Sequence, residues 1–161
     1  MAILFSVTMV SCNKDDDSPK VNYSPETEAE QVQSWITAMK SSDSDIDTTE
    51  HGIYYVIDSL GTGDLIKTGD VVTVKYAGYF VNGTMFDTSL SRGDGTMTFT
   101  HKSTDPTKRM IPGWEEAMEV LNKGGKAIFI IPSSLAYGTD GYGPIPPYTP
   151  LVFVIDVIDV K

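Results

Sequence analysis

The feature that most constrains the fold is a change of hydrophobic period near residue 51. From there on, short apolar or alternating runs at 53–58, 71–81, 97–100, 126–132 and 151–161 are rich in β-branched residues. Such runs are typical of strands, and the pair Asn82-Gly83 is typical of a hairpin turn. By composition, residues 86–96 and 101–109 are loops. Many strands, one short helical pattern and no repeating strand–helix–strand units predict an α+β fold with a mainly antiparallel sheet.

The helical pattern begins at Pro112, which suits a first-turn position because its missing N–H would have no partner there. Its apolar positions share one face at helical spacing: Trp114, Ala117, Met118 and Leu121. Lys123 and Gly124 are expected to end the helix. The adjacent Glu115 and Glu116 point about 100° apart on a helix. They therefore cannot flank one reacting atom as a carboxylate pair.

The charge of the chain excludes several classes of partner. The formal net charge is −10, and residues 1–50 alone contain ten acidic and three basic groups. Nucleic acids and anionic lipid surfaces attract basic proteins, so neither is expected as an electrostatic partner. A single cysteine rules out an intramolecular disulfide.

Residues 1–11 form an apolar run that is too short to span a bilayer and is followed by Cys12. The sequence Met9-Val10-Ser11-Cys12 resembles a bacterial lipobox. We therefore expect residues 1–11 to be the remnant of a lipoprotein signal peptide and Cys12 to be the lipidation site. A lone buried cysteine in a frayed N-terminus is the alternative. The next segment is polar, charged and punctuated by prolines, as in a solvated tether.

Residues 12–50 are expected to hold this tether and an amphipathic helix, with the domain boundary near His51. Ser24 is a favourable N-cap and Pro25 a favourable first residue. The apolar stripe of the helix is Val32, Trp35, Ile36 and Met39. We expect this stripe to dock on the domain that follows.

The chain lacks the usual signatures of metal, nucleophilic and phosphate chemistry. His51 and His101 are far apart in sequence, and no Cys/His cluster has ligand spacing. No nucleophile-elbow motif is present, and the glycine-rich runs lack the strand-then-helix context of a phosphate loop. We expect no metal and no cofactor.

Aromatic and aliphatic residues gather beside the loops instead. They are Tyr76, Phe86, Phe99, Ile111, Trp114, Tyr137, Ile145 and Phe153, with Asp87 among them. Singly, the aromatic and aliphatic residues fit an ordinary hydrophobic core, and Asp87 alone fits a turn or a cap. However, "VKYAGYFVNGTMFDTS", "MIPGWEEAM", "AYG" and "GPIPPYTPLVFVIDV" occur in that order and spacing. Residues 51–161 thereby resemble the FKBP-type peptidyl-prolyl cis-trans isomerases, which bind macrolides such as rapamycin.

The resemblance implies a half-barrel, in which a curved antiparallel sheet of five or six strands wraps around one short helix. Trp114 would form the floor of a shallow apolar pocket. The resemblance places these residues around it: Tyr76, Phe86, Met97, Phe99, Met110, Ile145 and Phe153. The Ile111 N–H and the Tyr137 hydroxyl would bind substrate carbonyls, and Asp87 would lie at the polar edge. Glu115 and Glu116 would face solvent.

The implied function is rotation about X-Pro bonds in exported proteins, carried out by a monomer that is lipid-anchored in the cell envelope. Proline-containing polypeptides would be the substrates and a macrolide a possible inhibitor. The tethered layout resembles the gliding-motility-associated lipoproteins of the family. The alternative is a non-catalytic module that holds proline-containing segments of a cell-envelope assembly. A general chaperone fits less well because residues 101–109 are polar.

Overall fold

The computed structural model describes residues 22–161, so the predictions for residues 1–11 and Cys12 lie outside the described residues. The helices are α1 (Pro25–Ser41) and α2 (Pro112–Met118), with 3-10 turns η1 (Ser89–Ser91), η2 (Pro106–Lys108) and η3 (Ser133–Leu135). The strands are β1 (Asp47–Thr48), β2 (Tyr54–Ser59), β3 (Val71–Tyr79), β4 (Met85–Thr88), β5 (Met97–Thr100), β6 (Lys126–Ile131) and β7 (Leu151–Val160).

These strands form one antiparallel sheet in the order β1-β2-β6-β7-β3-β4, with β5 also paired to β3. The predicted α+β class and antiparallel sheet are confirmed, but the sheet has seven strands where five or six were expected. The two short strands β1 and β4 account for the difference. Residues 86–88 were assigned to a loop and that assignment is wrong, because the turn after β3 folds them back onto β3.

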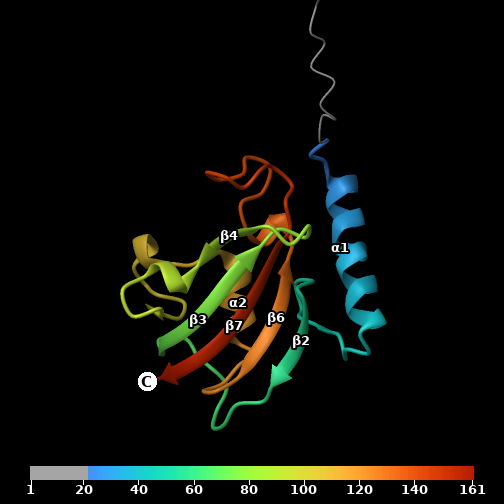
Figure 1. The fold of residues 1–161 in the computed structure, drawn as a ribbon. Helices are drawn as coiled ribbons and strands as arrows, with labels where there is room; N and C mark the ends of the chain where they lie inside the picture. The colour runs from blue at the N-terminus through green and yellow to red at the C-terminus, as the bar shows by residue number, and fades with distance from the viewer. Residues whose placement is uncertain (1–21) are drawn as a thin grey trace, which may run out of the picture.

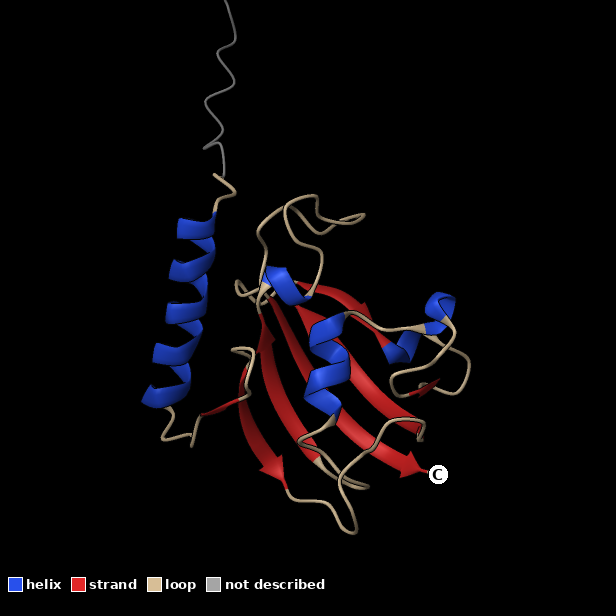
Figure 2. Ribbon diagram, turned by 180° about the vertical axis from the view of Figure 1, so that it is seen from behind, coloured by secondary structure: helices blue, strands red, loops and turns tan. Residues whose placement is uncertain are grey.

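The central strands of the sheet carry apolar side chains on both faces. Alternate residues along a strand point to opposite faces. Ala127, Phe129 and Ile131 of β6 belong to the main core, whereas Ile128 and Ile130 belong to a second apolar layer on the other face. Register shifts interrupt β2 against β6, β3 against β4, and β3 against β7. Irregularities of this kind increase the local bend of a sheet. The sheet thus curves around α2, as Figure 2 shows from behind.

Helix α2 lies against the inner face of the sheet. It begins at Pro112 as predicted, but it ends at Met118, earlier than expected. A turn continues the chain, because the Leu121 N–H donates to the Met118 carbonyl oxygen at 3.0 Å. Leu121 therefore still reaches the core, where it is buried together with Trp114.

Helix α1 is held beside β2 and the outer face of the sheet (Figure 1). Ser24 caps it, Pro25 is its first residue, and Trp35 and Ile36 pack with Ile130 and Val152. The expected docking of its apolar stripe on the domain is confirmed. Among residues 22–161, none of the helices has the length and apolar character needed to cross a bilayer.

Candidate active site

The inner face of the sheet and α2 bring four aromatic residues together with Trp114. Ring centroids of Tyr76 and Phe153 each lie 5.2 Å from the indole, and that of Phe99 lies 6.0 Å from it. The interplanar angles of 80°, 89° and 69° make all three contacts edge-to-face, an arrangement favoured by the aromatic quadrupole. Phe86 completes the cluster at 5.7 Å from Phe153.

Gly78 in β3 allows two of these rings to approach the sheet closely. A Cβ at this position would lie 2.8 Å from Cζ of Phe86 and 2.9 Å from Cε1 of Phe153. Carbon atoms in contact are ordinarily about 3.5–4.0 Å apart. A side chain at residue 78 would therefore push the rings outward, so this glycine is part of the architecture of the site.

Phe80 extends the aromatic row beyond the cluster. Its ring centroid lies 5.1 Å from that of Phe86. It was not among the residues predicted for the site, although it falls within the motif 74–89 that carried the resemblance. Its place beside the hairpin turn depends on the pairing of β4 with β3.

A polar chain borders the aromatic cluster. The Tyr76 hydroxyl donates to Asp87 Oδ2 at 2.6 Å and accepts from Arg92 Nη2 at 3.1 Å. Burial and the bond to Asp87 raise the pKa of Tyr76, although Arg92 opposes the shift. The phenol therefore remains a donor at neutral pH. Arg92 was not predicted, since it lies in a polar loop without a periodic pattern.

Two hydrogen-bond donors lie free at the edge of the cluster. Among the described residues, neither the Ile111 N–H nor the Tyr137 hydroxyl has a hydrogen-bond acceptor. Ile111 is the residue immediately before α2, and Tyr137 follows η3 with its ring stacked on Tyr142 at 5.2 Å. Burial, Tyr142 and Asp87 together raise the pKa of Tyr137, which keeps its hydroxyl protonated.

The remaining predicted residues belong to the same apolar core. Ile145 is buried in it, and Met97 and Met110 are partly buried against it. Phe86 and Ile111 are also partly buried, whereas Asp87 is exposed. The fold therefore places the predicted aromatic and aliphatic residues in or against the core that contains Trp114, and Tyr76, Phe99 and Phe153 contact the indole directly.

Trp114 itself is 2% exposed, and its Nε1 has no hydrogen-bond partner among the described residues. The described protein atoms thus give the indole a largely apolar environment. The rings of Tyr76, Phe99 and Phe153 contact it, and Phe86, Ile111 and Tyr137 are partly buried against the same core. Such a site suits an apolar ring.

The prediction that Glu115 faces solvent is wrong. Glu115 is 7% exposed, and its carboxylate accepts the N–H groups of Lys102 at 2.8 Å and of Met110 at 3.1 Å. The fully buried His101 places Nδ1 2.9 Å from Glu115 Oε2, but this contact lacks the alignment of a hydrogen bond. Glu115 therefore fixes the chain entering α2, including the segment that carries the Ile111 N–H.

Glu116 is also only partly exposed, which corrects the same prediction. It accepts the His51 N–H at 3.1 Å and lies 3.0 Å from His51 Nδ1. Burial alone would raise its pKa, but the bonds from Thr49 and His51 outweigh burial and lower it. Both glutamates thus anchor neighbouring loops to α2.

Comparison with known proteins places this arrangement in a family. The family model of the FKBP-type peptidyl-prolyl cis-trans isomerases matches residues 63–158, which is more than half of the chain. The chain belongs to the FKBP-type peptidyl-prolyl cis-trans isomerase family. The match includes the aromatic cluster, the β3–β4 hairpin and α2.

Curated relatives from bacteria carry the same family name. A probable FKBP-type isomerase of Haemophilus influenzae is 41% identical over 118 residues, covering 73% of this chain and 46% of the relative. FkpA of Escherichia coli is 37% identical over 116 residues, covering 72% of this chain and 40% of the relative. The chain thus spans less than half the length of these relatives.

Solved structures of the family share the fold. The crystal structure of Escherichia coli FkpA matches with a TM-score of 0.68 and 31% identity, covering 84% of this chain and 62% of that one. A peptidyl-prolyl isomerase from Pseudomonas syringae matches with a TM-score of 0.69 and 28% identity, covering 87% of this chain and 98% of that one.

Proposed function

We propose that this chain catalyses cis–trans isomerisation of X-Pro bonds in polypeptides, with residues 51–161 as the catalytic domain. The observation that carries the proposal is the aromatic cluster around Trp114, bordered by two unpaired donors, in a chain of this family. The proline ring would lie against the indole. The Ile111 N–H and Tyr137 hydroxyl would donate to carbonyl groups on either side of it.

The reaction suits a site without acid–base chemistry. Rotation about a peptide bond is opposed by a barrier of roughly 18–20 kcal/mol, because twisting removes amide resonance. The twisted amide has less charge separation across its C–N bond than the planar one. Apolar surroundings therefore favour the twisted form relative to the planar form, and fixed donors hold the substrate in place. No covalent bond is formed or broken.

Each wall of the cluster has a distinct part in this proposal. Tyr76, Phe99 and Phe153 hold the indole edge-on and exclude water. Met97, Met110 and Ile145 supply further apolar surface. Asp87 acts through Tyr76, because its carboxylate accepts a 2.6 Å hydrogen bond from the Tyr76 hydroxyl and so fixes that ring.

Entry of the substrate requires movement at the rim. Since Trp114 is 2% exposed, a proline ring can stack on it only if neighbouring side chains move, and we propose Phe86 and Tyr137 for this role. Both are partly buried, and rotamer changes of such side chains are common on binding. Binding should therefore alter the environment of Trp114, which tryptophan fluorescence can detect.

The test is a cis/trans assay with a short proline peptide. We expect the chain to accelerate isomerisation, and Phe86→Ala and Asp87→Leu to lower kcat/KM by about tenfold or more, equivalent to roughly 1.4 kcal/mol of transition-state binding. Leu90→Ala is the matched control, because Leu90 is exposed nearby in η1. Absence of any acceleration would contradict the proposal. Retained binding of the peptide would then favour a non-catalytic proline-binding module.

We further propose that the domain works in the cell envelope, tethered by a lipid at Cys12. The apolar run before Cys12 and the polar segment behind it support this placement, as they do in the gliding-motility-associated lipoproteins that the layout resembles. Incorporation of labelled palmitate that disappears in Cys12→Ala would support the anchor. Fractionation of the native chain with soluble proteins would refute it.

Exported polypeptides with slow X-Pro bonds would be the substrates of such an enzyme, since uncatalysed isomerisation takes tens of seconds. We propose that it acts as a monomer and that a macrolide competes for the aromatic cluster. Light scattering measures whether the chain is a monomer. Inhibition of the peptide assay by rapamycin tests whether a macrolide binds the aromatic cluster. Inhibition that leaves peptide binding unchanged would place the macrolide elsewhere.

A further inference from the structure

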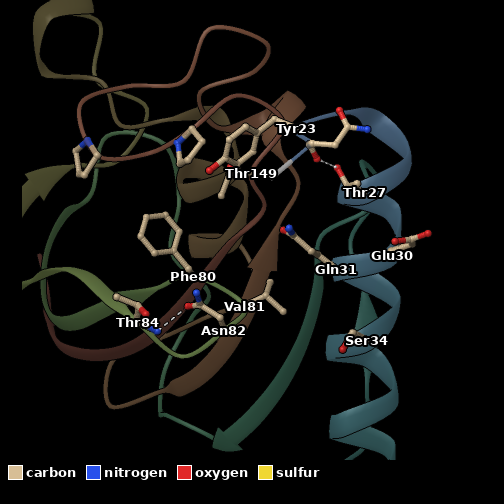
Figure 3. Close-up of a pocket in the computed structure, with 13 residues that line it drawn as sticks. Tyr23, Thr27, Glu30, Gln31, Ser34, Phe80, Val81, Asn82, Thr84 and Thr149 are labelled. Atoms are coloured by element: carbon tan, nitrogen blue, oxygen red, sulfur yellow. Dashed lines mark hydrogen bonds between the residues drawn. The ribbon is translucent and has the colours of Figure 1, made fainter. Parts of the chain in front are cut away.

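A hollow lies between α1 and the domain, next to the candidate active site. It has a volume of about 760 Å³, and we call it the α1 groove. Three segments line it, as Figure 3 shows in close-up. Its lining residues include Thr27, Glu30, Gln31 and Ser34 of α1, Phe80, Val81, Asn82 and Thr84 of the β3–β4 hairpin, and Pro144, Pro146 and Thr149 of the loop before β7.

The α1 groove is continuous with the aromatic cluster. Phe80 lines the groove and also packs on Phe86, which in turn packs on Phe153. On the other wall, Ile145 is buried in the core while its neighbours Pro144 and Pro146 line the groove. Both walls of the candidate active site therefore extend into the groove. A polypeptide whose proline lies near Trp114 can follow these walls away from the cluster.

The chemistry of the groove suits a peptide backbone. Phe80 and the prolines provide apolar surface, and the side chains of Gln31 and Ser34 form no hydrogen bonds within residues 22–161. Figure 3 shows Gln31 extending from α1 toward Phe80 and Asn82. Free amide and hydroxyl groups can pair with the N–H and C=O groups of an extended chain. Of the lining residues that the structure describes, Glu30 is the one that carries a charge.

The position of α1 is set before any ligand binds. Glu28 accepts two hydrogen bonds from Ser133, one from its N–H at 2.5 Å and one from its hydroxyl at 2.7 Å. Trp35 and Ile36 hold the middle of the helix on the outer sheet layer. A groove whose walls are fixed in this way avoids an ordering cost on binding.

We propose that the α1 groove binds the segment of the substrate polypeptide that flanks the isomerised proline, and that it prefers uncharged or basic residues there. This inference rests on the proposed function and concerns the substrate of the same site. Contacts with substrate residues away from the reacting bond raise kcat/KM when these contacts are kept in the transition state. The acidic Glu30 disfavours acidic flanking residues.

The test compares a blocked tetrapeptide with the same X-Pro core extended on both sides by neutral residues. We expect kcat/KM to be about threefold or more higher for the extended peptide. Ser34→Trp fills the groove and should abolish this advantage while leaving the tetrapeptide rate unchanged. Gln33→Trp is the matched control, because Gln33 is exposed on the same helix but does not line the groove.

Reversing the charge of Glu30 tests the preference for flanking residues. Glu30→Lys should reverse the preference, so that an acidic flanking segment becomes the better substrate. Equal kcat/KM for both peptide lengths in the native chain would overturn the inference, as would equal effects of Ser34→Trp and Gln33→Trp. Self-association that Ser34→Trp disrupts, without any advantage for the extended peptide, would instead make the groove a contact between copies.

The two proposals fail in different ways. If the chain accelerates neither peptide, the proposed function fails. Titration of the extended peptide against the native chain and Ser34→Trp still tests the groove in that case, because binding needs no turnover. Loss of affinity in Ser34→Trp alone would support the groove, and unchanged affinity would refute it.

Discussion

At the scale of single residues, the contact between Tyr76 and Asp87 joins the aromatic cluster to its polar edge. Tyr76→Phe removes a 2.6 Å hydrogen bond to a carboxylate. We expect a loss of about 1–2 kcal/mol in the free energy of unfolding, toward the low end for charged acceptors because Asp87 is exposed. Urea denaturation measures this loss. We expect kcat/KM to fall as well, since the ring loses its fixed orientation.

The pH dependence of this loss has a defined sign. The pKa of Tyr76 is raised in the folded state by burial and by Asp87. The stability that the Tyr76–Asp87 hydrogen bond adds is therefore fully present below the unfolded tyrosine pKa of about 10. It is lost as the pH rises through the pKa of Tyr76 in the folded state. Tyr55→Phe is a second test of the same kind, because Tyr55 donates to Asp47 at 3.2 Å and burial and Asp47 raise its pKa in the same direction. A stability difference between the native and Tyr76→Phe chains that shows no decrease as the Tyr76 phenol ionises, followed by its ultraviolet absorbance, would contradict this account.

Gly78 provides the second prediction at this scale. A methyl group there would collide with Phe86 and Phe153, so Gly78→Ala should displace both rings. We expect an unfolding cost of about 1–3 kcal/mol, typical of overpacking, and a drop in kcat/KM on the order of tenfold. Gly93→Ala is the control, since a Cβ there meets no atom within 4 Å. Equal activity of the two variants would show that the rings tolerate the displacement.

At the scale of elements, the entry into α2 depends on Glu115. Glu115→Ala would leave the N–H groups of Lys102 and Met110 without their acceptor. We expect a cost of roughly 2–4 kcal/mol in unfolding free energy, because each buried donor left unpaired costs about 1–3 kcal/mol. Glu119→Ala removes an exposed ion pair with Lys102 and should cost less than about 1 kcal/mol. Similar losses for both variants in urea denaturation would argue against an anchoring role for Glu115.

The elements also show how far the sequence alone predicts this molecule. Alternation and β-branched runs located the long strands, and helical spacing located Trp114 on the buried face of α2, because these patterns are local. Strand β4 was missed because its residues alternate only between exposed and partly buried positions. The burial of Glu115 depends on backbone donors at Lys102 and Met110, and local spacing cannot reveal them. The Glu28–Ser133 contact joins residues 105 positions apart and has no sequence signal.

At the scale of the whole molecule, two apolar layers lie on opposite faces of one sheet and should be separable by mutation. Trp35→Ala removes a ring from the outer layer, whereas Trp114 belongs to the inner one. We expect Trp35→Ala to lower the free energy of unfolding by about 3–5 kcal/mol, the range for large-to-small core substitutions. Because the inner layer remains intact, turnover of a tetrapeptide by the folded fraction should stay near that of the native chain.

Trp35→Ala should also lower kcat/KM for longer peptides. Loosening of α1 disturbs one wall of the α1 groove, so the advantage of an extended peptide should shrink in Trp35→Ala. Trp35→Phe keeps most of the buried surface and should preserve that advantage. Measuring both peptides well below the melting temperature separates stability from binding. Loss of tetrapeptide turnover in folded Trp35→Ala would show that the outer layer shapes the aromatic cluster through the sheet, and the two layers would then form one cooperative unit.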